Sequence, residues 1–352
     1  MNRMKKILNQ MTWESISEKR SLIFGFLTIM IFCYHFCEDA LHLKGFPLIL
    51  KPLGMYGNCA VDIFLLLSGL GLYYSFSKNS NILEFYKKRF VRVLVPYLML
   101  ALPYLIWKDF FVSFQPIEFF LDWFLITAFQ PSNRQCWFVA AILIFYLLYP
   151  LVHKLINDKG RNALIVIGVV MMLTILLYYA ADPVYQTVEV ALTRFPVFIM
   201  GSYLGTLSRQ GVPIGKRTMW HLFLILPIAG MIKVVLYVLS RKLGIELPYI
   251  DRFWLGYVGL AILFFATVFF NLVEGKKKLQ GFFLFFGTIS LEMYVAHVQV
   301  RRAFFHYVQS QSIGVYILGY ALCIIPLGLL MAVAVSRLYR RLFDQKAAKE
   351  RS

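Results

Sequence analysis

Long apolar stretches recur along the whole chain, and they constrain its fold more than any other feature. A helix needs about 20 apolar residues to cross the hydrocarbon core of a bilayer. Hydropathy and the helix breakers between stretches predict ten such spans, at 21–37, 58–77, 93–106, 135–153, 163–181, 190–207, 219–239, 253–273, 283–300 and 313–336. Only 15% of the 352 residues are charged and 60% are hydrophobic, which is too apolar for a soluble domain. The sequence predicts an all-α polytopic membrane protein, a bundle of about ten transmembrane helices.

The basic residues are unevenly distributed between the loops. Ten spans place both termini on one side, and the segments on that side carry 25 of the 36 Lys and Arg residues. By the positive-inside rule this side is the cytoplasm. Topology then explains the formal net charge of +18 without a nucleic-acid partner, and basic loops also suit anionic lipid headgroups. We expect both termini to be cytoplasmic.

The same reasoning divides the chain into three parts. We predict a cytoplasmic N-terminal arm at 1–20, a transmembrane domain at 21–336 and a basic cytoplasmic tail at 337–352. The outer segment 107–134 is apolar but too short to span, so we expect it to lie in the interface as an amphipathic or re-entrant piece. The five cysteines form no CxxC pair, which indicates neither a disulfide framework nor a metal site.

Ionisable side chains within the predicted spans are few: His35, Asp62, Arg194, Lys233, Glu292 and His297. Such groups are costly in lipid and usually face an internal cavity. Counting along the helices places five polar groups at a similar depth beneath the outer surface: His35, Asp62, Arg194, Tyr294 and His297. Glu38 and Asp39 follow His35 by three and four residues, where a carboxylate on the same helix face would orient the imidazole.

Each of these groups also has a structural interpretation. A histidine near a helix end often keeps its tip in water, and the structural alternative for Asp62 and Arg194 is that they pair with each other or with the interface. Lys233, close to an outer end, is expected to snorkel, and Glu292 would neutralise a cation of a neighbouring helix.

Two arginines, Arg89 and Arg92, lie one helical turn apart just before the third span. Two forked guanidinium groups on one side of a helix suit phosphates. Topology alone also makes every loop on this side basic, so the pair by itself supports both interpretations.

Six stretches taken together resemble the acyltransferase-3 family of integral-membrane O-acyltransferases. They occur in the order of the family and extend over nearly the whole chain: CYHF, VDIFLLLSGLGL, FYKKRFVRVLVPY, CWFVAAILIFYLLYP, TRFPVFIMGSYLG and GTISLEMYVAH. The resemblance implies an enzyme that takes an acyl group, usually acetyl, from cytoplasmic acyl-CoA and passes it to a hydroxyl of a cell-surface or envelope glycan. It also implies acetyl-CoA or another acyl-CoA as donor and a bacterial inner (plasma) membrane as location.

The resemblance also implies roles for individual residues. His35 is the expected catalytic residue, and Arg89 and Arg92, with Lys88 beside them, are expected to hold the phosphates of coenzyme A. The family usually has an arginine eleven residues before this histidine, where this chain has Phe24. Either a nearby base such as Arg20 substitutes for it, or this chain handles its donor differently. Asp62, Arg194 and His297 match further polar positions of the family motifs.

These residues predict a mechanism and leave two other classes of protein open. His35, polarised by Glu38, Asp39 or Asp62, would act as general base or carry the acyl group transiently. Arg194 or Tyr294 would stabilise the oxyanion. A secondary transporter or flippase for an envelope substrate would also need buried ionisable groups, although paired inverted halves are not evident. The third class is a non-catalytic partner of envelope-polysaccharide assembly proteins.

Overall fold

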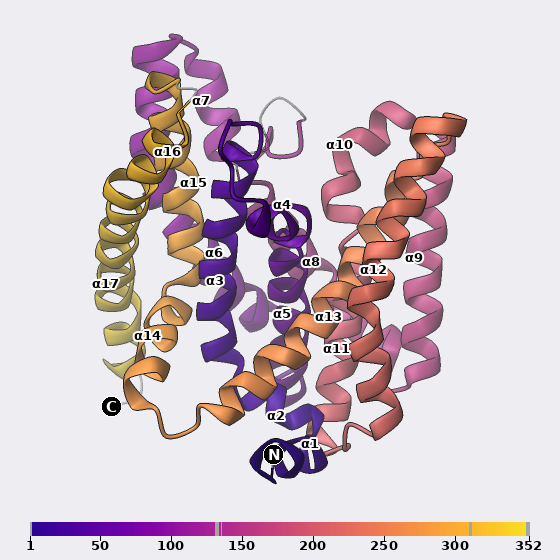
Figure 1. Cartoon of the computed structure of the whole chain (residues 1–352). Coiled ribbons are helices and arrows are strands. Elements are labelled where there is room, and N and C mark those ends of the chain that lie inside the picture. Colours follow the sequence, from indigo (N-terminus) through magenta and orange to yellow (C-terminus); the bar gives the residue numbers. More distant parts are fainter. Residues whose placement is uncertain (1, 131–133, 135, 310–311, 350–352) are drawn as a thin grey trace. The chain divides into compact units, whose positions relative to one another are not determined.

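The computed structural model describes residues 2–130, 134, 136–309 and 312–349. Every regular element in these ranges is a helix (Figure 1). The α-helices are α1 (Asn2–Gln10), α2 (Trp13–Glu18), α3 (Arg20–Ala40), α4 (Lys51–Tyr56), α5 (Cys59–Lys78), α6 (Ile82–Ile106), α7 (Pro116–Trp123), α8 (Trp137–Ile156), α9 (Gly160–Ala180), α10 (Asp182–Leu192), α11 (Phe195–Arg209), α12 (Lys216–Leu243), α13 (Pro248–Leu272), α14 (Lys277–Thr288), α15 (Ser290–Tyr307), α16 (Ile313–Gly319) and α17 (Ile325–Lys349). Shorter turns are η1 (Leu48–Leu50) and the π-helical η2 (Trp107–Val112) and η4 (Tyr320–Ile324).

The lengths of these helices agree with the predicted spans. In the part of the chain that the structure describes, nine helical stretches are long and apolar enough to cross a membrane. Helices α14 and α15 together would make a tenth, but the helix is interrupted at Ile289. Each predicted span falls on one of these ten stretches, with residue 135 of the fourth lying outside the described residues. The all-α membrane fold is therefore confirmed, while the side on which the termini lie stays a prediction.

The helices form two compact units, and each unit is assembled from three separate stretches of the chain. Unit 1 comprises residues 1–31, 56–82 and 147–287, and unit 2 comprises residues 32–55, 83–146 and 288–352. Helix α3 contributes its first half to unit 1 and its second half to unit 2. Unit 1 therefore contains α5 and α11, and unit 2 contains α6, α15 and α17.

In unit 1, α5 and α11 approach each other closely because glycines lie at their crossing. A Cβ atom added to Gly69 would lie 2.2 Å from the carbonyl oxygen of Phe198, and one added to Gly201 would lie 2.0 Å from that of Leu66. Only glycine allows two backbones this close, a recurrent device in membrane helix packing. The crossing therefore fixes the positions of the side chains that lie near it on both helices.

A polar contact ties the end of α2 to the segment after α13. The ammonium group of Lys19 donates to the Glu274 carboxylate at 2.9 Å. This bond lowers the pKa of the Glu274 carboxyl from its ordinary value, because it favours the charged form. The Glu274 side chain is exposed, so the bond contributes little to stability.

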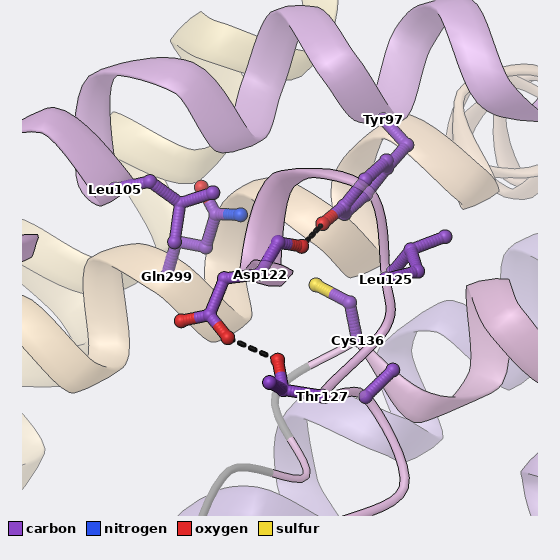
Figure 2. Close-up of a pocket in the computed structure, with 8 residues that line it drawn as sticks. Tyr97, Leu105, Asp122, Leu125, Thr127, Cys136 and Gln299 are labelled. Carbon is purple, nitrogen blue, oxygen red and sulfur yellow. Dashed lines mark hydrogen bonds between the residues drawn. The ribbon is translucent and has the colours of Figure 1, made fainter. Parts of the chain in front are cut away.

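In unit 2, the segment between α6 and α8 folds back on α6. The Tyr97 hydroxyl donates to the backbone carbonyl of Asp122 at 2.7 Å, and the Asp122 carboxylate accepts from Thr127 (Figure 2). The same carboxylate also accepts from Lys108. Large apolar side chains of this segment are exposed, as expected of a piece that lies against lipid: Ile117, Phe120, Phe124 and Ile126. Its interfacial position stays a prediction, and residues 131–133 lie outside the described ranges.

Figure 2 shows a small polar cavity under this segment. Its lining includes Asp122, Thr127, Cys136 and Gln299, and its volume is about 20 Å³. That is room for about one water molecule, so the cavity is too small for a substrate.

Candidate active site

A pair of histidines joins α3 to α15 within unit 2. The Nδ1 atom of His35 lies 2.7 Å from the Nε2 atom of His297, and the two rings are stacked at 4.9 Å between centroids. On its other side, Nδ1 of His297 lies 3.1 Å from the carbonyl oxygen of Met293. The two imidazoles and the carbonyl therefore form one hydrogen-bonded chain.

The direction of this chain follows from its last member. A backbone carbonyl only accepts, so Nδ1 of His297 must carry the proton that it donates to Met293. In a neutral imidazole the other nitrogen is then an acceptor, so Nε2 of His297 accepts from the Nδ1–H of His35. Nε2 of His35 consequently keeps its lone pair, and this nitrogen is the one able to take a proton from a bound hydroxyl.

The two histidines differ in exposure in the way a base and its orienting partner should. His297 is 0% exposed, whereas His35 is only half-buried. His297 is held from several sides. The Phe32 ring meets its imidazole edge-on at 4.9 Å between centroids, and a Cβ added to Gly328 of α17 would lie 3.2 Å from its Cα. A fixed, buried imidazole thus sets the tautomer of an accessible one.

A second contact between the same two helices lies one turn further along both. The Nε of Arg301 donates to an Asp39 carboxylate oxygen at 2.7 Å, and its Nη2 donates to Glu38 at 2.9 Å. The Tyr320 hydroxyl also donates to Asp39, at 2.5 Å. Asp39 follows His35 by four residues and Arg301 follows His297 by four, so each pair lies on one helix face. The ion pair therefore fixes the register in which the histidines meet.

The carboxylates of Glu38 and Asp39 thus both pair with Arg301. The described contacts give the imidazole of His35 a different partner, His297. Tyr294, one turn before His297, is half-buried, and its ring lies 6.3 Å from that of His297 between centroids. The Tyr294 ring also meets that of Phe138 in α8, at 5.3 Å between centroids.

The basic residues at the start of α6 have three different environments. Arg92 donates to the buried Glu292 of α15 at 2.5 Å. The Arg89 guanidinium lies 6.0 Å from the centroid of the Phe85 ring, and Lys88 pairs with Glu84 at 2.5 Å on the exposed helix face. Glu292 precedes His297 by five residues, about 7.5 Å along a helix. Arg92 therefore contacts the helix that carries His297.

The predicted residues Asp62 and Arg194 lie in unit 1, where they face each other. They are 1% and 3% exposed, and Nε of Arg194 lies 3.5 Å from an Asp62 carboxylate oxygen. Arg194 also donates to the carbonyl of Val190 at 2.9 Å. Both carboxylate oxygens of Asp62 are buried and have no hydrogen bond within the described ranges. The arrangement is a closed, buried ion pair between the start of α11 and α5.

The first half of α3 shows what occupies the position of the arginine that the family pattern leads one to expect. Phe24 stacks on Phe64 of α5 at 5.2 Å between ring centroids. Arg20, the nearest arginine, lies over α5 one turn earlier, since a Cβ added to Gly71 would come within 2.1 Å of its guanidinium. Both contacts are within unit 1.

Sequence reasoning did not single out Arg301 or Tyr320. Arg301 lies one residue beyond the predicted end of the ninth span, so it was counted among loop charges. Its spacing from His297 repeats that of Asp39 from His35, and this repeated spacing is the signal that points to it. No group of three His, Cys, Asp or Glu side chains among the described residues is arranged to hold a metal ion.

Comparison with known protein families identifies the family to which this chain belongs. Neither curated proteins nor solved structures gave a match. The model of the acyltransferase-3 family, described as an acyltransferase domain, matches residues 25–337 and so includes both histidines and the Arg92–Glu292 pair. The chain therefore belongs to the acyltransferase-3 family and is a membrane acyltransferase.

Proposed function

We propose that the protein transfers an acyl group, in the first instance acetyl, from cytoplasmic acyl-CoA to a hydroxyl of an envelope glycan. The observation that carries the proposal is the directed hydrogen-bond chain that ends on Nε2 of His35. Such a chain equips one accessible nitrogen as a general base, which is what attack by an alcohol on a thioester requires. Membership of the acyltransferase-3 family supports the reaction class.

In the proposed reaction, Nε2 of His35 takes the proton of the glycan hydroxyl as its oxygen attacks the thioester carbonyl. A C–O bond forms, and the carbonyl becomes a tetrahedral oxyanion. Collapse of this intermediate breaks the C–S bond, and the proton on His35 passes to the departing thiolate of coenzyme A. The products are the ester and free coenzyme A, and the enzyme returns to its starting state.

His297 acts on this reaction through His35. While His35 holds the additional proton, its Nδ1–H still donates to His297, so the imidazolium stays oriented towards both the incoming and the leaving atom. The Asp39–Arg301 contact keeps the two helices in the register that this bond needs. Asp39 and Arg301 are therefore positioning residues.

Tyr294 is our candidate for stabilising the oxyanion. It lies on α15 one turn from His297, and its half-buried phenol is a hydrogen-bond donor. One well-placed donor of this kind contributes about 10²–10³-fold to the rate of acyl transfer.

The donor is proposed to bind with its phosphates near Arg92. A charged nucleotide does not enter lipid, but the flexible pantetheine arm of coenzyme A can pass between helices. Arg92 contacts α15 at Glu292, so this arm would follow α15 from the phosphates to His297.

The function is tested with purified protein in nanodiscs, labelled acetyl-CoA and a panel of envelope glycans. We expect one equivalent of free coenzyme A for each acetyl group found on a glycan. A transporter or flippase would move its cargo unmodified and release no coenzyme A, and that result would contradict the proposal.

A second measurement separates the two roles open to His35. Protein incubated with labelled acetyl-CoA in the absence of a glycan is denatured rapidly at neutral pH, because an acyl-imidazole hydrolyses quickly in acid, and is examined at once for label. We expect no label on the protein, because a general base forms no bond to the acyl group. Label on His35 would show instead that it carries the acyl group transiently.

A further inference from the structure

A second cavity of unit 2 lies between α6 and α17. It is lined by Arg92, Ser336, Tyr339 and Arg340, and its volume is about 230 Å³. Ser336 ends the predicted tenth span, and Tyr339 and Arg340 belong to the segment 337–352, which the sequence explains only as a basic cytoplasmic tail. Tyr339 and Arg340 lie beyond residue 337, where the match to the family model ends.

The lining of this cavity is cationic. Of its four side chains two are arginines, and none is acidic. The charge of Arg92 is balanced from behind by the buried Glu292, and its guanidinium stacks 5.2 Å from the centroid of the Tyr339 ring. Arg340 donates to the Ser336 hydroxyl at 3.1 Å, a neutral acceptor that leaves its positive charge in place.

The residues of α17 that line the cavity share one face of the helix. At about 100° per residue, Ser336, Tyr339 and Arg340 fall within an arc of roughly 100°. Arg337 and Arg341 fall outside this arc, and neither lines the cavity. Of the three arginines in the last turns of α17, only Arg340 therefore lines the cavity together with Arg92.

We propose that Arg340, with Ser336 and Tyr339, forms the second half of a phosphate-binding site whose first half is Arg92. The inference rests on the proposed function and deepens it, because the phosphates are those of the acyl-CoA donor. Two forked guanidiniums facing one cavity suit a phosphate or diphosphate group. Sites for drug-sized ligands measure roughly 300–1,000 Å³, so this cavity takes the phosphate portion and leaves the rest of the donor outside.

A phosphate at this position has two sources, the donor nucleotide or the headgroup of an anionic lipid. The experiment compares binding of coenzyme A with binding of pantetheine, which lacks the nucleotide and its phosphates. Each is measured in nanodiscs of neutral phosphatidylcholine and in nanodiscs that also contain phosphatidylglycerol. The variants are Arg340→Gln, Arg340→Lys and the control Arg341→Gln, which removes the same charge from the neighbouring position.

In neutral nanodiscs we expect Arg340→Gln to lower the affinity for coenzyme A about tenfold, which is the effect of losing one charge-assisted hydrogen bond. Arg340→Lys keeps the charge but loses the fork, so it should retain part of the affinity. Arg341→Gln should bind as the wild type does. Pantetheine should bind all the variants equally, since it has no phosphate to lose.

Three outcomes would overturn the inference. If wild-type protein binds coenzyme A and Arg340→Gln binds it equally well, Arg340 is not part of the donor site and the proposed function survives. If Arg340→Gln differs only in nanodiscs with phosphatidylglycerol, the cavity holds a lipid headgroup instead. If wild-type protein does not bind coenzyme A, the proposed function fails together with the inference.

Discussion

Each unit of this protein buries a pair of ionisable side chains between membrane helices, and the two pairs are built differently. In unit 1, Asp62 and Arg194 are 1% and 3% exposed and face each other, and Arg194 also donates to a backbone carbonyl. In unit 2, His297 is 0% exposed but its partner His35 is half-buried. The first pair is closed, whereas the second has an accessible end.

We interpret this difference as one between a pair that stabilises helix packing and a pair equipped for chemistry. In a closed ion pair the carboxylate and the guanidinium mainly compensate each other's burial. In the histidine chain every proton position is set by the Met293 carbonyl, which leaves one acceptor nitrogen on His35. An ionisable residue within a span therefore indicates a candidate functional site. The direction of its hydrogen bonds then shows whether it has a donor or acceptor left for a substrate.

The largest effect is expected at the accessible end of the histidine pair. His35→Ala removes the proposed base, and we expect transfer to glycan to fall by about 10³-fold, within the range for general bases. His42→Ala is the matched control, because His42 is an exposed histidine of the same unit. Acetyl transfer is measured per correctly folded molecule in the membrane. Near-normal transfer by His35→Ala would remove the catalytic role.

Replacing the buried His297 should reduce the rate of transfer less than replacing His35. The size of the reduction should depend on the side chain that replaces it. His297→Phe fills the space but offers no acceptor to Nδ1–H of His35, so we expect the rate of transfer to fall about 100-fold. His297→Gln places a carbonyl oxygen near the same position and should recover part of this loss. The measurement is kcat for each variant beside KM for the donor. Near-normal transfer by His297→Phe would mean that His297 only fills space, and equal losses in the two variants would mean that the acceptor atom does not account for the loss.

Much of the fold was accessible from the sequence, because a bilayer imposes one length and one polarity on every spanning helix. Each of the ten predicted spans overlaps a stretch of helix, and five of them match both ends of that stretch to within about five residues. The second and third were predicted too short: the helical stretch Leu48–Lys78 begins before residue 58, and Ile82–Val112 begins before residue 93. Residues 82–92, which precede the third span, carry five charged side chains and so give no strong hydropathy signal, which explains the second of these differences.

The site was accessible only in part. The rarity of ionisable groups within spans selected His35 and His297, and also Asp62 and Arg194. The pairing of His35 with His297 was not accessible, because it depends on which faces of α3 and α15 meet. Glu38 and Asp39 were selected by their spacing from His35, but this spacing does not reveal a cation on another helix that competes for the same carboxylates. In unit 2 that cation is Arg301.

Mutation of the closed pair of unit 1 should lower the stability of the protein. Asp62→Asn leaves the Arg194 charge buried without its carboxylate, so we expect the free energy of unfolding to fall by about 3 kcal/mol. The transfer rate per folded molecule should remain near that of the wild type. Glu189→Gln is the control, because its partner Arg252 lies 3.6 Å away and is 31% exposed, which predicts a smaller loss. A stable Asp62→Asn protein without activity would show that Asp62 acts in the chemistry, as the sequence alone allows.

The smallest effect is expected at the contact that sets the register of the histidines. Asp39→Asn keeps the shape of the side chain but loses the charge that holds Arg301, so the rate of transfer should fall about tenfold, the equivalent of about 1.4 kcal/mol. Glu38→Gln should cost less, because the Glu38 side chain is 48% exposed and that of Asp39 only 14%. Transfer rates are measured with saturating donor. A larger loss in Glu38→Gln than in Asp39→Asn would indicate that Glu38 contacts the substrate, and that the register of α3 and α15 is fixed by other contacts.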